Sequence, residues 1–349
     1  MTSMGLGGIQ QCLVPYSLAL KKLGYEIQIL VLEKSGVLAP LAEHGLDAHV
    51  VLLKRGWKLF RYLPNPELKR HIQSFGPDIV IGFAQLGFFE AKQASRSLGV
   101  PVITHVGTMR IPRLGRFGKA DGWLATTPEM QATLAGIGFP AERIFVVPNF
   151  LPENSRPRPP RVLHAPPLVG SLGRFVPRKG FHVLVEAIAL LQDRGIAVQC
   201  EIAGGGKALP ELARQIEARG ASGYIRLIGW VDKAAKAEFL QRIDLFVSPS
   251  LNEPFGIVYL DAMQVGAPVI VTPTVGARYI FSAPGSAEIV PFDDPAALAD
   301  AIARVLANEG QRTALGVNAE QNYTARFGLD AGARHLEQAL QQMAVLQKK

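Results

Sequence analysis

The sequence is poor in cysteine and lacks any hydrophobic run long enough to cross a bilayer. Its two cysteines, Cys12 and Cys200, stand far apart and outside any CxxC or histidine-rich pattern, so we expect buried thiols rather than a metal or redox site. No apolar run reaches the roughly 18–20 residues that a spanning helix needs. The N-terminus shows neither the basic start nor the apolar block of a secretory leader. These absences favour a cytosolic protein.

The chain is long and rich in hydrophobic residues and glycine. Its 349 residues exceed what one hydrophobic core usually serves, so we expect two domains. A hydrophobic content of 48% and 35 glycines spread without repeats suit an α/β protein and argue against disorder. Strand and helix patterns alternate on both sides of a proline-rich break at 152–160. We therefore predict two doubly wound, Rossmann-like α/β domains, 1–158 and 159–328, with a helix at 329–349 that packs back on the first domain.

The short apolar runs predict parallel strands at 27–32, 78–82, 100–104, 122–126, 144–147, 168–172, 198–203, 225–228, 245–247 and 268–271. Ligands of such sheets lie at the carboxyl ends of the strands, so the cleft between the domains is the expected site. One strand is missing from the pattern, because only Met1–Ser3 precede the glycine loop Met4–Gly8. Either the start is truncated or miscalled, or the N-terminal sheet lacks a strand; the sequence leaves these alternatives open.

The net charge of +8 lies almost wholly in the N-terminal half. Residues 1–160 carry 18 basic against 11 acidic residues, and residues 161–349 carry 19 against 18. Such a basic surface attracts phosphates, anionic membranes or nucleic acid. Nucleic acid is disfavoured, because no recognised module or aromatic-basic platform is present. At 56–63, aromatic residues alternate with basic ones, which suits a helix lying on anionic lipid or an ordinary amphipathic surface helix.

Two segments of the second half predict anion binding. After a strand and a Ser-Pro-Ser turn, Pro254 suits the first turn of a helix, whose free N–H groups at Phe255, Gly256 and Ile257 would bind anions or hydroxyls. Glu253 lies just before this helix start and Asp261 lies eight residues further on. Their spacing fits two carboxylates that face the same ligand. It fits equally well a helix cap at Glu253 and a surface or structural acid at Asp261. In the second segment, Arg174 and Lys179 lie in a glycine-rich loop before a helix, which predicts a diphosphate clamp or a solvated basic loop.

Taken together, these motifs resemble a known family. The string Glu253-Pro-Phe-Gly, Asp261-Ala-Met and Gly266-Ala-Pro-Val-Ile270 is similar to the signature of the retaining glycosyltransferase family 4, whose fold is GT-B. Further segments that match the family in order and spacing are Gly7-Gly8, 173–180, 202–205, 227–229 and 244–250. The resemblance covers the chain from Gly5 to about Phe327. It implies transfer of a sugar from a nucleotide-diphosphate donor to a glycan or lipid-linked acceptor.

The resemblance also implies roles for single residues. Arg174 and Lys179 would neutralise the donor diphosphate as it leaves, so no cofactor and no metal is expected, and the sequence has no Asp-x-Asp motif. Glu253 matches the first glutamate of a Glu-x7-Glu pattern, near the donor sugar. Asp261 replaces the second glutamate, which binds the ribose. His105, expected at a strand end, resembles the family's histidine near the transferred sugar. The remaining expected donor contacts are Gly7, Gly8, Gly173, Gly205, Val231, Phe255, Gly256 and Ile257.

One loop departs from the family, and it affects the expected donor contacts. The family usually has a Gly-Gly pair and a glutamate where this chain has Gly276-Ala277 and Arg278-Tyr279. For the donor base we favour uridine, since Lys233 cannot accept the hydrogen bonds that guanine donates, although Asp232 could if it turned inward. We favour a front-side attack, because no second carboxylate is clearly paired with Glu253. The alternatives are a nucleotide-sugar epimerase or hydrolase of the same fold and a non-catalytic nucleotide-sugar-binding protein.

Overall fold

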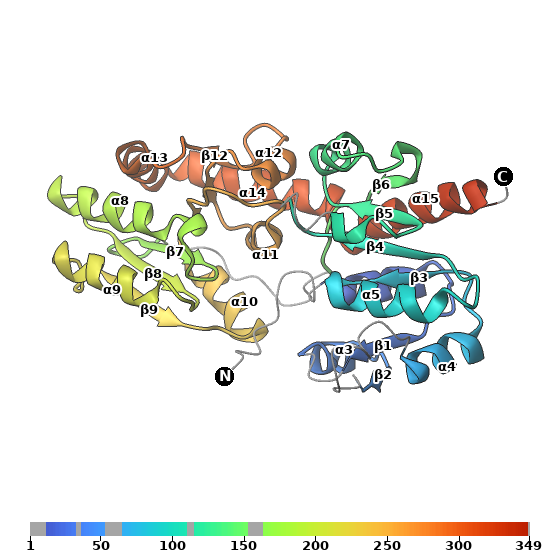
Figure 1. Ribbon diagram of the computed structural model, residues 1–349. Helices are drawn as coiled ribbons and strands as arrows, with labels where there is room; N and C mark the ends of the chain where they lie inside the picture. Colours follow the sequence, from blue (N-terminus) through green and yellow to red (C-terminus); the bar gives the residue numbers. More distant parts are fainter. Residues whose placement is uncertain (1–11, 33–35, 53–64, 110–114, 153–162, 348–349) are drawn as a thin grey trace. The chain divides into compact units, whose positions relative to one another are not determined.

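The structure is a computed structural model that describes residues 12–32, 36–52, 65–109, 115–152 and 163–347 (Figure 1). The chain divides into two compact units, one formed by Met1–Pro152 with Gly328–Lys349 and the other by Glu153–Phe327. The glycine loop at Met4–Gly8, the question of a strand before it and the amphipathic segment at 56–63 lie outside the described residues. No described helix is long and apolar enough to span a membrane.

The C-terminal unit is built on one parallel sheet of six strands. These are β7 (Leu168–Leu172), β8 (Gln199–Ala203), β9 (Ile225–Gly229), β10 (Leu245–Ser248), β11 (Val269–Val271) and β12 (Glu288–Ile289). Their order in the sheet is β12-β11-β10-β7-β8-β9. The chain thus winds outward from β7 to β9, returns to place β10 beside β7, and then winds the other way. This is a doubly wound sheet with its topological switch point between β7 and β10.

Helices connect these strands and bury the sheet. They are η4 (Pro177–Lys179), α8 (Phe181–Asp193), α9 (Leu209–Ala218), α10 (Lys233–Arg242), α11 (Ile257–Gln264), α12 (Val275–Ile280), α13 (Pro295–Ala307) and α14 (Glu309–Arg326). Helix α8 packs against α9 and α13, and α11 packs against α10 and α14. Fully buried residues such as Leu184, Ile202 and Val305 join α8, the sheet and α13 in one hydrophobic core. Burial of this kind supplies most of a domain's stability.

The N-terminal unit contains two parallel sheets among its described residues. One pairs β1 (Ile29–Leu32) with β2 (Ala48–Val51); the other has the order β3 (Val80–Gly82), β4 (Val102–Val106), β5 (Gly122–Ala125) and β6 (Ile144–Val146). The connecting elements are α2 (Leu13–Lys22), α3 (Leu38–Glu43), α4 (Pro66–Phe75), α5 (Ala84–Ser95), η2 (Gly115–Phe117), α7 (Pro128–Gly136) and η3 (Ala141–Arg143). The succession from α2 to β4 repeats that from α8 to β11. A counterpart of the central strand β7 is absent from the part of this unit that the structure describes.

The last helix, α15 (Leu329–Gln347), belongs to the N-terminal unit. It packs against α2 and β6, and in Figure 1 the red helix lies beside strands of that unit. Contact is close: a Cβ added at Gly332 would lie 2.0 Å from the ring of Phe150. Lys22 of α2 pairs with Asp330 at the start of α15. The end of the chain is therefore an integral part of the unit formed by its beginning.

The α/β class with parallel sheets is confirmed, and every predicted strand is present within two residues of its expected ends. Two strands were not predicted. β2 lies at a sheet edge with mostly exposed side chains, and β12 has only two residues, so neither carries a buried-strand pattern. The expected strand 100–104 instead runs from Val102 to Val106. His105 consequently lies within the strand and not at its end.

Candidate functional site

The switch point of the C-terminal sheet brings together the two segments that the sequence predicts to bind anions. Residues 173–180 follow β7, and residues 249–256 follow the neighbouring strand β10. The two loops are joined directly: the N–H of Leu251 donates to the carbonyl of Arg178 at 2.9 Å, and Nη1 of Arg178 donates to the carbonyl of Asn252 at 3.0 Å. The carboxyl ends of strands at such a switch point form the crevice where doubly wound sheets bind ligands.

Glycine at position 180 lets the loops approach this closely. Gly180 has φ of +67°, and a Cβ there would lie 1.9 Å from the carbonyl oxygen of Pro249. Any other residue would meet both the strain of a left-handed backbone and a clash with the neighbouring loop. The glycine therefore sets the distance between the loop that carries Lys179 and the loop that carries Glu253.

Lys179 and Glu253 form an ion pair across the two loops. Nζ of Lys179 lies 2.5 Å from Oε2 of Glu253, and the side chains are only 12% and 14% exposed. Arg174 lies in the same loop but is exposed, and its guanidinium has no ion-pair partner among the described residues. The site thus holds one cation balanced by a carboxylate and one cation available to an incoming anion.

A second ion pair joins the next two helices. Nζ of Lys236 on α10 lies 2.6 Å from Oδ1 of Asp261 on α11, with side-chain exposures of 17% and 13%. Asp232, just before α10, accepts a hydrogen bond from the N–H of Ala235 at 2.9 Å and caps the helix. Its carboxylate thus has the usual role of an N-cap. Val231 lies beside it in the loop after β9 and is half-buried.

Glycines line the carboxyl ends of β7 and β8. The N–H of Gly173 donates to the carbonyl of Ala203 at 3.0 Å, and the N–H of Phe175 donates to that of Gly205 at 2.8 Å. A Cβ at Gly204 would lie 1.9 Å from the carbonyl oxygen of Gly173, whereas one at Gly205 would meet nothing within 4 Å. Gly204 is therefore required for packing, and Gly205 leaves open space that a ligand can enter.

The helix after Glu253 begins later than the sequence predicts. α11 starts at Ile257, not at Pro254, because Gly256 takes a left-handed conformation with φ of +96° and separates the turn from the helix. Phe255 is buried against Tyr279 and Phe327, with ring centroids 6.4 and 6.1 Å away. Phe255 thus anchors the loop in the core. The backbone of Gly256 and Ile257 remains at the helix start.

The segment 272–279, which departs from the family pattern, contacts the loop that carries Glu253. Gly276 near the start of α12 donates its N–H to the carbonyl of Glu253 at 3.0 Å. A Cβ at Gly276 would lie 1.9 Å from the carbonyl oxygen of Phe255. Arg278 donates from Nη1 to the carbonyl of Pro273 at 2.6 Å. The first glycine of the usual pair is therefore a packing requirement that this chain retains.

His105 is the predicted site residue of the N-terminal unit, and it is 1% exposed. Its Nε2 lies 2.8 Å from Oδ1 of Asn149, which follows β6. Burial lowers the pKa of His105 from 6.5 to about 4, so the imidazole is neutral at physiological pH. Gly7 and Gly8, the other expected contacts of this unit, lie outside the described residues.

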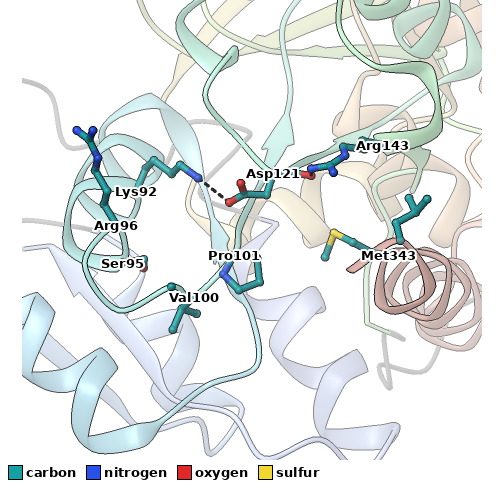
Figure 2. A pocket seen from close by; sticks show the side chains of 10 residues that line it. Lys92, Ser95, Arg96, Val100, Pro101, Asp121, Arg143 and Met343 are labelled. Atoms are coloured by element: carbon teal, nitrogen blue, oxygen red, sulfur yellow. Dashed lines mark hydrogen bonds and ion pairs between the residues drawn. The ribbon is translucent and has the colours of Figure 1, made fainter. Parts of the chain in front are cut away.

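The cavity drawn in Figure 2 is a different place. It has a volume of about 290 Å³ and lies where β4 and β5 begin, next to α5 and α15, with Lys92, Asp121, Arg143 and Met343 in its wall. Asp121 pairs with Lys92 at 2.6 Å. None of the sequence-predicted site residues lines it, and it lies at the end of the strands opposite to the ligand-binding edge.

Sequence reasoning missed two partners of the predicted site residues, Lys236 and Asn149. Lys236 is 25 residues from Asp261, and Asn149 is 44 residues from His105, so no local spacing reveals either contact. A usable signal for Asn149 was its place as a polar residue three positions after β6, a strand of a parallel sheet. No group of three or more His, Cys, Asp or Glu side chains in the described residues is arranged to hold a metal ion.

Two family models match nearly the whole chain. "Glycosyl transferase 4-like domain" matches residues 7–149, and "Glycosyl transferases group 1" matches residues 156–322. The boundary between the matches falls within a few residues of the boundary between the two units of the structure.

Both named relatives and solved crystal structures are similar to this chain. The lipopolysaccharide core biosynthesis glycosyltransferase LpsE of Rhizobium meliloti is 31% identical over 83% of this chain and 89% of its own length. LpsD of the same organism is 27% identical over 92% and 91%. The crystal structure of Anabaena Alr3699/HepE with UDP and glucose is 18% identical, covers 98% of both chains and superimposes with a TM-score of 0.80. The lipopolysaccharide outer core galactosyltransferase WaaB gives a TM-score of 0.72 at 17% identity, over 97% of this chain and 96% of its own.

These likenesses confirm the GT-B fold and agree with the order of motifs along the chain. The paired charges at the switch point lie where a doubly wound sheet binds its ligand. The chain therefore belongs to the group 1 glycosyltransferases of the GT4 type.

Proposed function

We propose that this glycosyltransferase moves a sugar from a uridine diphosphate sugar to a glycan or lipid-linked acceptor, with retention of the anomeric configuration and without a metal ion. The observation that carries the proposal is the cluster of Arg174, Lys179 and Glu253 at the switch point. Lys179 pairs with the carboxylate of Glu253, and Arg174 lies exposed in the same loop as Lys179, at the ligand-binding edge of the C-terminal sheet.

The two cations suit a diphosphate leaving group. As the bond between C1 of the sugar and the phosphate oxygen breaks, that oxygen gains negative charge. Fixed cations that stabilise developing charge lower the barrier, and they do so best in a partly dehydrated site. Lys179 is only 12% exposed, so its charge is weakly screened. In this proposal Arg174 and Lys179 together supply the positive charge, and no divalent ion is needed.

The position of Asp232 supports uridine as the base. Guanine offers N–H donors and would favour a carboxylate partner. Asp232 is the acidic residue that could have turned inward, and its Oδ1 instead accepts the N–H of Ala235. Uracil offers a single N–H, at N3 between two carbonyl acceptors, and so does not call for both oxygens of a carboxylate. Asp261, held by Lys236, has the chemistry to accept hydrogen bonds from the ribose hydroxyls, as the family resemblance implies.

Retention follows from a front-side reaction in this proposal. The acceptor hydroxyl forms the new bond to C1 on the face that the phosphate leaves, and its proton passes to the departing phosphate oxygen. No protein nucleophile is needed. Glu253 is paired with Lys179. In this proposal its carboxylate positions the lysine and accepts hydrogen bonds from the sugar hydroxyls, and it does not attack C1.

The acceptor and the place of action are proposed from the relatives and from the charge distribution. Two relatives are named for lipopolysaccharide core biosynthesis, which suggests a lipid-linked glycan acceptor. The excess of basic residues in the N-terminal half suits weak contact with the anionic inner face of the plasma membrane, at about 1 kcal/mol per basic residue near the surface. Sedimentation with anionic and neutral vesicles at low and high salt tests this. Absence from the anionic pellet at low salt, or equal binding to neutral vesicles, contradicts it.

Calorimetry with UDP and GDP in buffer containing EDTA tests the donor. We expect UDP to bind more tightly, and Lys179→Met to weaken UDP binding by roughly 10–100-fold through loss of a charge-assisted contact. Arg214→Met, which removes an exposed cation from α9, is the control and should bind UDP normally. Tighter GDP binding overturns the uridine assignment, and loss of binding in EDTA overturns metal independence.

Product analysis tests the reaction itself. NMR of the sugar product from a UDP-hexose panel with a membrane-glycan extract as acceptor gives its anomeric configuration. A product linked with the donor's own configuration supports retention, and an inverted one contradicts it. Release of free sugar or an altered nucleotide sugar without any acceptor would instead favour an epimerase or hydrolase.

A further inference from the structure

The cavity of the N-terminal unit (Figure 2) has an excess of positive charge in its wall. Lys92 and Arg96 at the end of α5 and Arg143 in η3 contribute three cations, and Asp121 contributes the carboxylate. The C-terminal end of α5 adds a partial negative charge of about half a unit. Three cations outweigh that partial charge and a single carboxylate, so the wall attracts anions.

The carboxylate of Asp121 is already used by the fold. Its Oδ2 accepts hydrogen bonds from the N–H of Val102 at 2.7 Å and from Nζ of Lys92 at 2.6 Å. These contacts tie the first residue of β4 to the residue before β5. Figure 2 shows Asp121 between Lys92 and Arg143. Asp121 thus balances the charge of Lys92, and the charges of the two arginines remain for another anion.

Both arginines keep most of their hydrogen-bond donors. Nη1 of Arg143 lies 3.5 Å from the carbonyl oxygen of Asp121, at the outer limit of a hydrogen bond, and its side chain has no other printed-range partner among the described residues. Arg96 is exposed, and within the same described ranges its side chain has no ion-pair partner. A guanidinium carries five N–H donors in a planar fork that fits a phosphate group.

Ser95 adds an unpaired hydroxyl to the same wall. The residue lines the cavity and is 1% exposed, and its buried Oγ has no hydrogen-bond partner among the described residues. Buried polar groups in native proteins almost always have a partner, because leaving one unsatisfied is costly. A ligand oxygen in this cavity would supply an acceptor for the hydroxyl.

The rest of the wall is apolar, and the cavity is small. Its volume of about 290 Å³ is at the lower end of the range for small-molecule sites. The wall is completed by Gly99, Val100, Pro101, Met343 and Leu346. A molecule that joins a phosphate group to a small, partly apolar body therefore matches both the charged and the apolar parts of the wall.

We propose that this cavity is a ligand site, separate from the donor site, that binds the phosphate group of a soluble phosphate ester or of a lipid headgroup. Arg143 and Arg96 supply the charge, Ser95 donates from the wall, and Asp121 keeps Lys92 in place. The site lies wholly within the N-terminal unit, at the strand ends opposite to the usual ligand-binding edge. It does not depend on the proposed donor or acceptor.

NMR of the full chain with carbon-13 methionine methyl groups tests whether inorganic phosphate enters the cavity. Phosphate replaces chloride at constant ionic strength, which removes general screening effects, and saturating UDP occupies the donor site. We expect a saturable shift of the Met343 signal, assigned with Met343→Leu, and none for Met263, which is buried in the other unit. The Met343 signal reports on the cavity whether or not UDP binds. Its failure to shift overturns the proposal.

Variants test which side chains hold the phosphate. Arg143→Met should weaken phosphate binding by roughly tenfold through loss of a charge-assisted contact, and Ser95→Ala by roughly threefold. Arg70→Met removes an exposed cation of α4 that does not line the cavity, and it should bind phosphate within about twofold of the wild type. Unchanged binding in Arg143→Met, or equal weakening in Arg143→Met and Arg70→Met, overturns the site.

Glycerol 3-phosphate and monomeric dihexanoyl phosphatidic acid distinguish the two sources of the phosphate group. Both carry a phosphate monoester on glycerol, and they differ in two short acyl chains. A preference of about tenfold or more for the lipid, as expected when part of a chain is buried against Met343 and Leu346, assigns the site to a lipid headgroup. Equal affinities assign it to a soluble phosphate ester. If neither shifts the Met343 signal, the site is overturned, and the proposed sugar transfer is unaffected by that result.

Discussion

Replacing Gly276 by alanine is the most informative change in the C-terminal unit, because two physical effects predict opposite results. Gly276 lies in α12 and its φ is not in the left-handed region. In an ordinary helix, alanine at such a position stabilises by about 1 kcal/mol relative to glycine. Here, however, the added Cβ would lie 1.9 Å from the carbonyl oxygen, 2.3 Å from the carbonyl carbon and 2.5 Å from the Cα of Phe255.

The clash cannot be relieved by a side-chain rotation, since all three neighbours are backbone atoms. Real Cβ contacts below 3.0 Å essentially never occur, so the loop carrying Glu253 must move by roughly 1 Å, a displacement that costs about 10²-fold at a reacting or binding centre. Overpacking also costs about 1–3 kcal/mol of stability. For a unit of this size, each kcal/mol lowers the melting temperature by roughly 2–4 °C.

Calorimetric titration with UDP and thermal unfolding measure the two consequences. We expect Gly276→Ala to lower the unfolding midpoint by several degrees and to weaken UDP binding by about 10–100-fold. Gly223→Ala is the control, because a Cβ at Gly223 meets nothing within 4 Å. If Gly276→Ala is instead more stable than the wild type and binds UDP equally well, the close approach of α12 to the carboxylate loop is refuted.

Three further predictions concern single charges. Arg174→Met should weaken UDP binding by roughly tenfold without changing the unfolding midpoint, since Arg174 is exposed and lacks an ion-pair partner in the described ranges; a fall in stability would contradict this. Lys236→Met should weaken UDP binding and destabilise the unit, because it leaves the 13%-exposed Asp261 without its partner, whereas Arg214→Met on the exposed face of α9 should do neither. His105, with its pKa lowered by burial to about 4, makes the unfolded chain bind more protons between pH 6.5 and 4. Stability should therefore fall by about 3 kcal/mol as the pH drops through that window, and equal pH slopes for wild type and His105→Gln in urea unfolding would refute the assignment.

The fold was largely predictable because its strands are short buried runs. The run 168–172 lies between Pro167 and Gly173, and the run 245–247 is followed by Ser248-Pro249. Short, mostly apolar runs that end at such turn residues are typical of parallel strands. β2 was not predicted, because an edge strand with exposed side chains lacks the continuous apolar pattern of a buried strand. The helix start after Glu253 was misplaced for a related reason: Pro254 is favourable at a first helical position, but the left-handed Gly256 ends the turn before the helix begins.

The residues of the candidate site were predictable as types, but not as contacts. The glycine-rich loop with two cations and the segment with Glu253 and Asp261 each fit a ligand site, but read alone each fits a solvated loop or a structural role equally well. Their joining depends on β10 lying beside β7, a pairing between strands more than 70 residues apart. Likewise nothing in the sequence near His105 identifies Asn149 as its hydrogen-bond partner. Such information resides in the sheet order and not in local patterns.

The two lysine–carboxylate pairs explain how a site can carry charge and still be stable before a donor arrives. An unpaired ion at an exposure of 12–17% would be costly to desolvate, and Glu253 and Asp261 offset that cost for Lys179 and Lys236. An incoming diphosphate brings more negative charge than the single carboxylate of Glu253, so Lys179 can turn part of its hydrogen bonding to the phosphate while Glu253 becomes available to sugar hydroxyls. Among the described residues Arg174 has no carboxylate partner to exchange, and its side chain is exposed, so salt screens its charge. Salt should therefore weaken UDP binding mainly through Arg174, and the salt dependence should largely disappear in Arg174→Met.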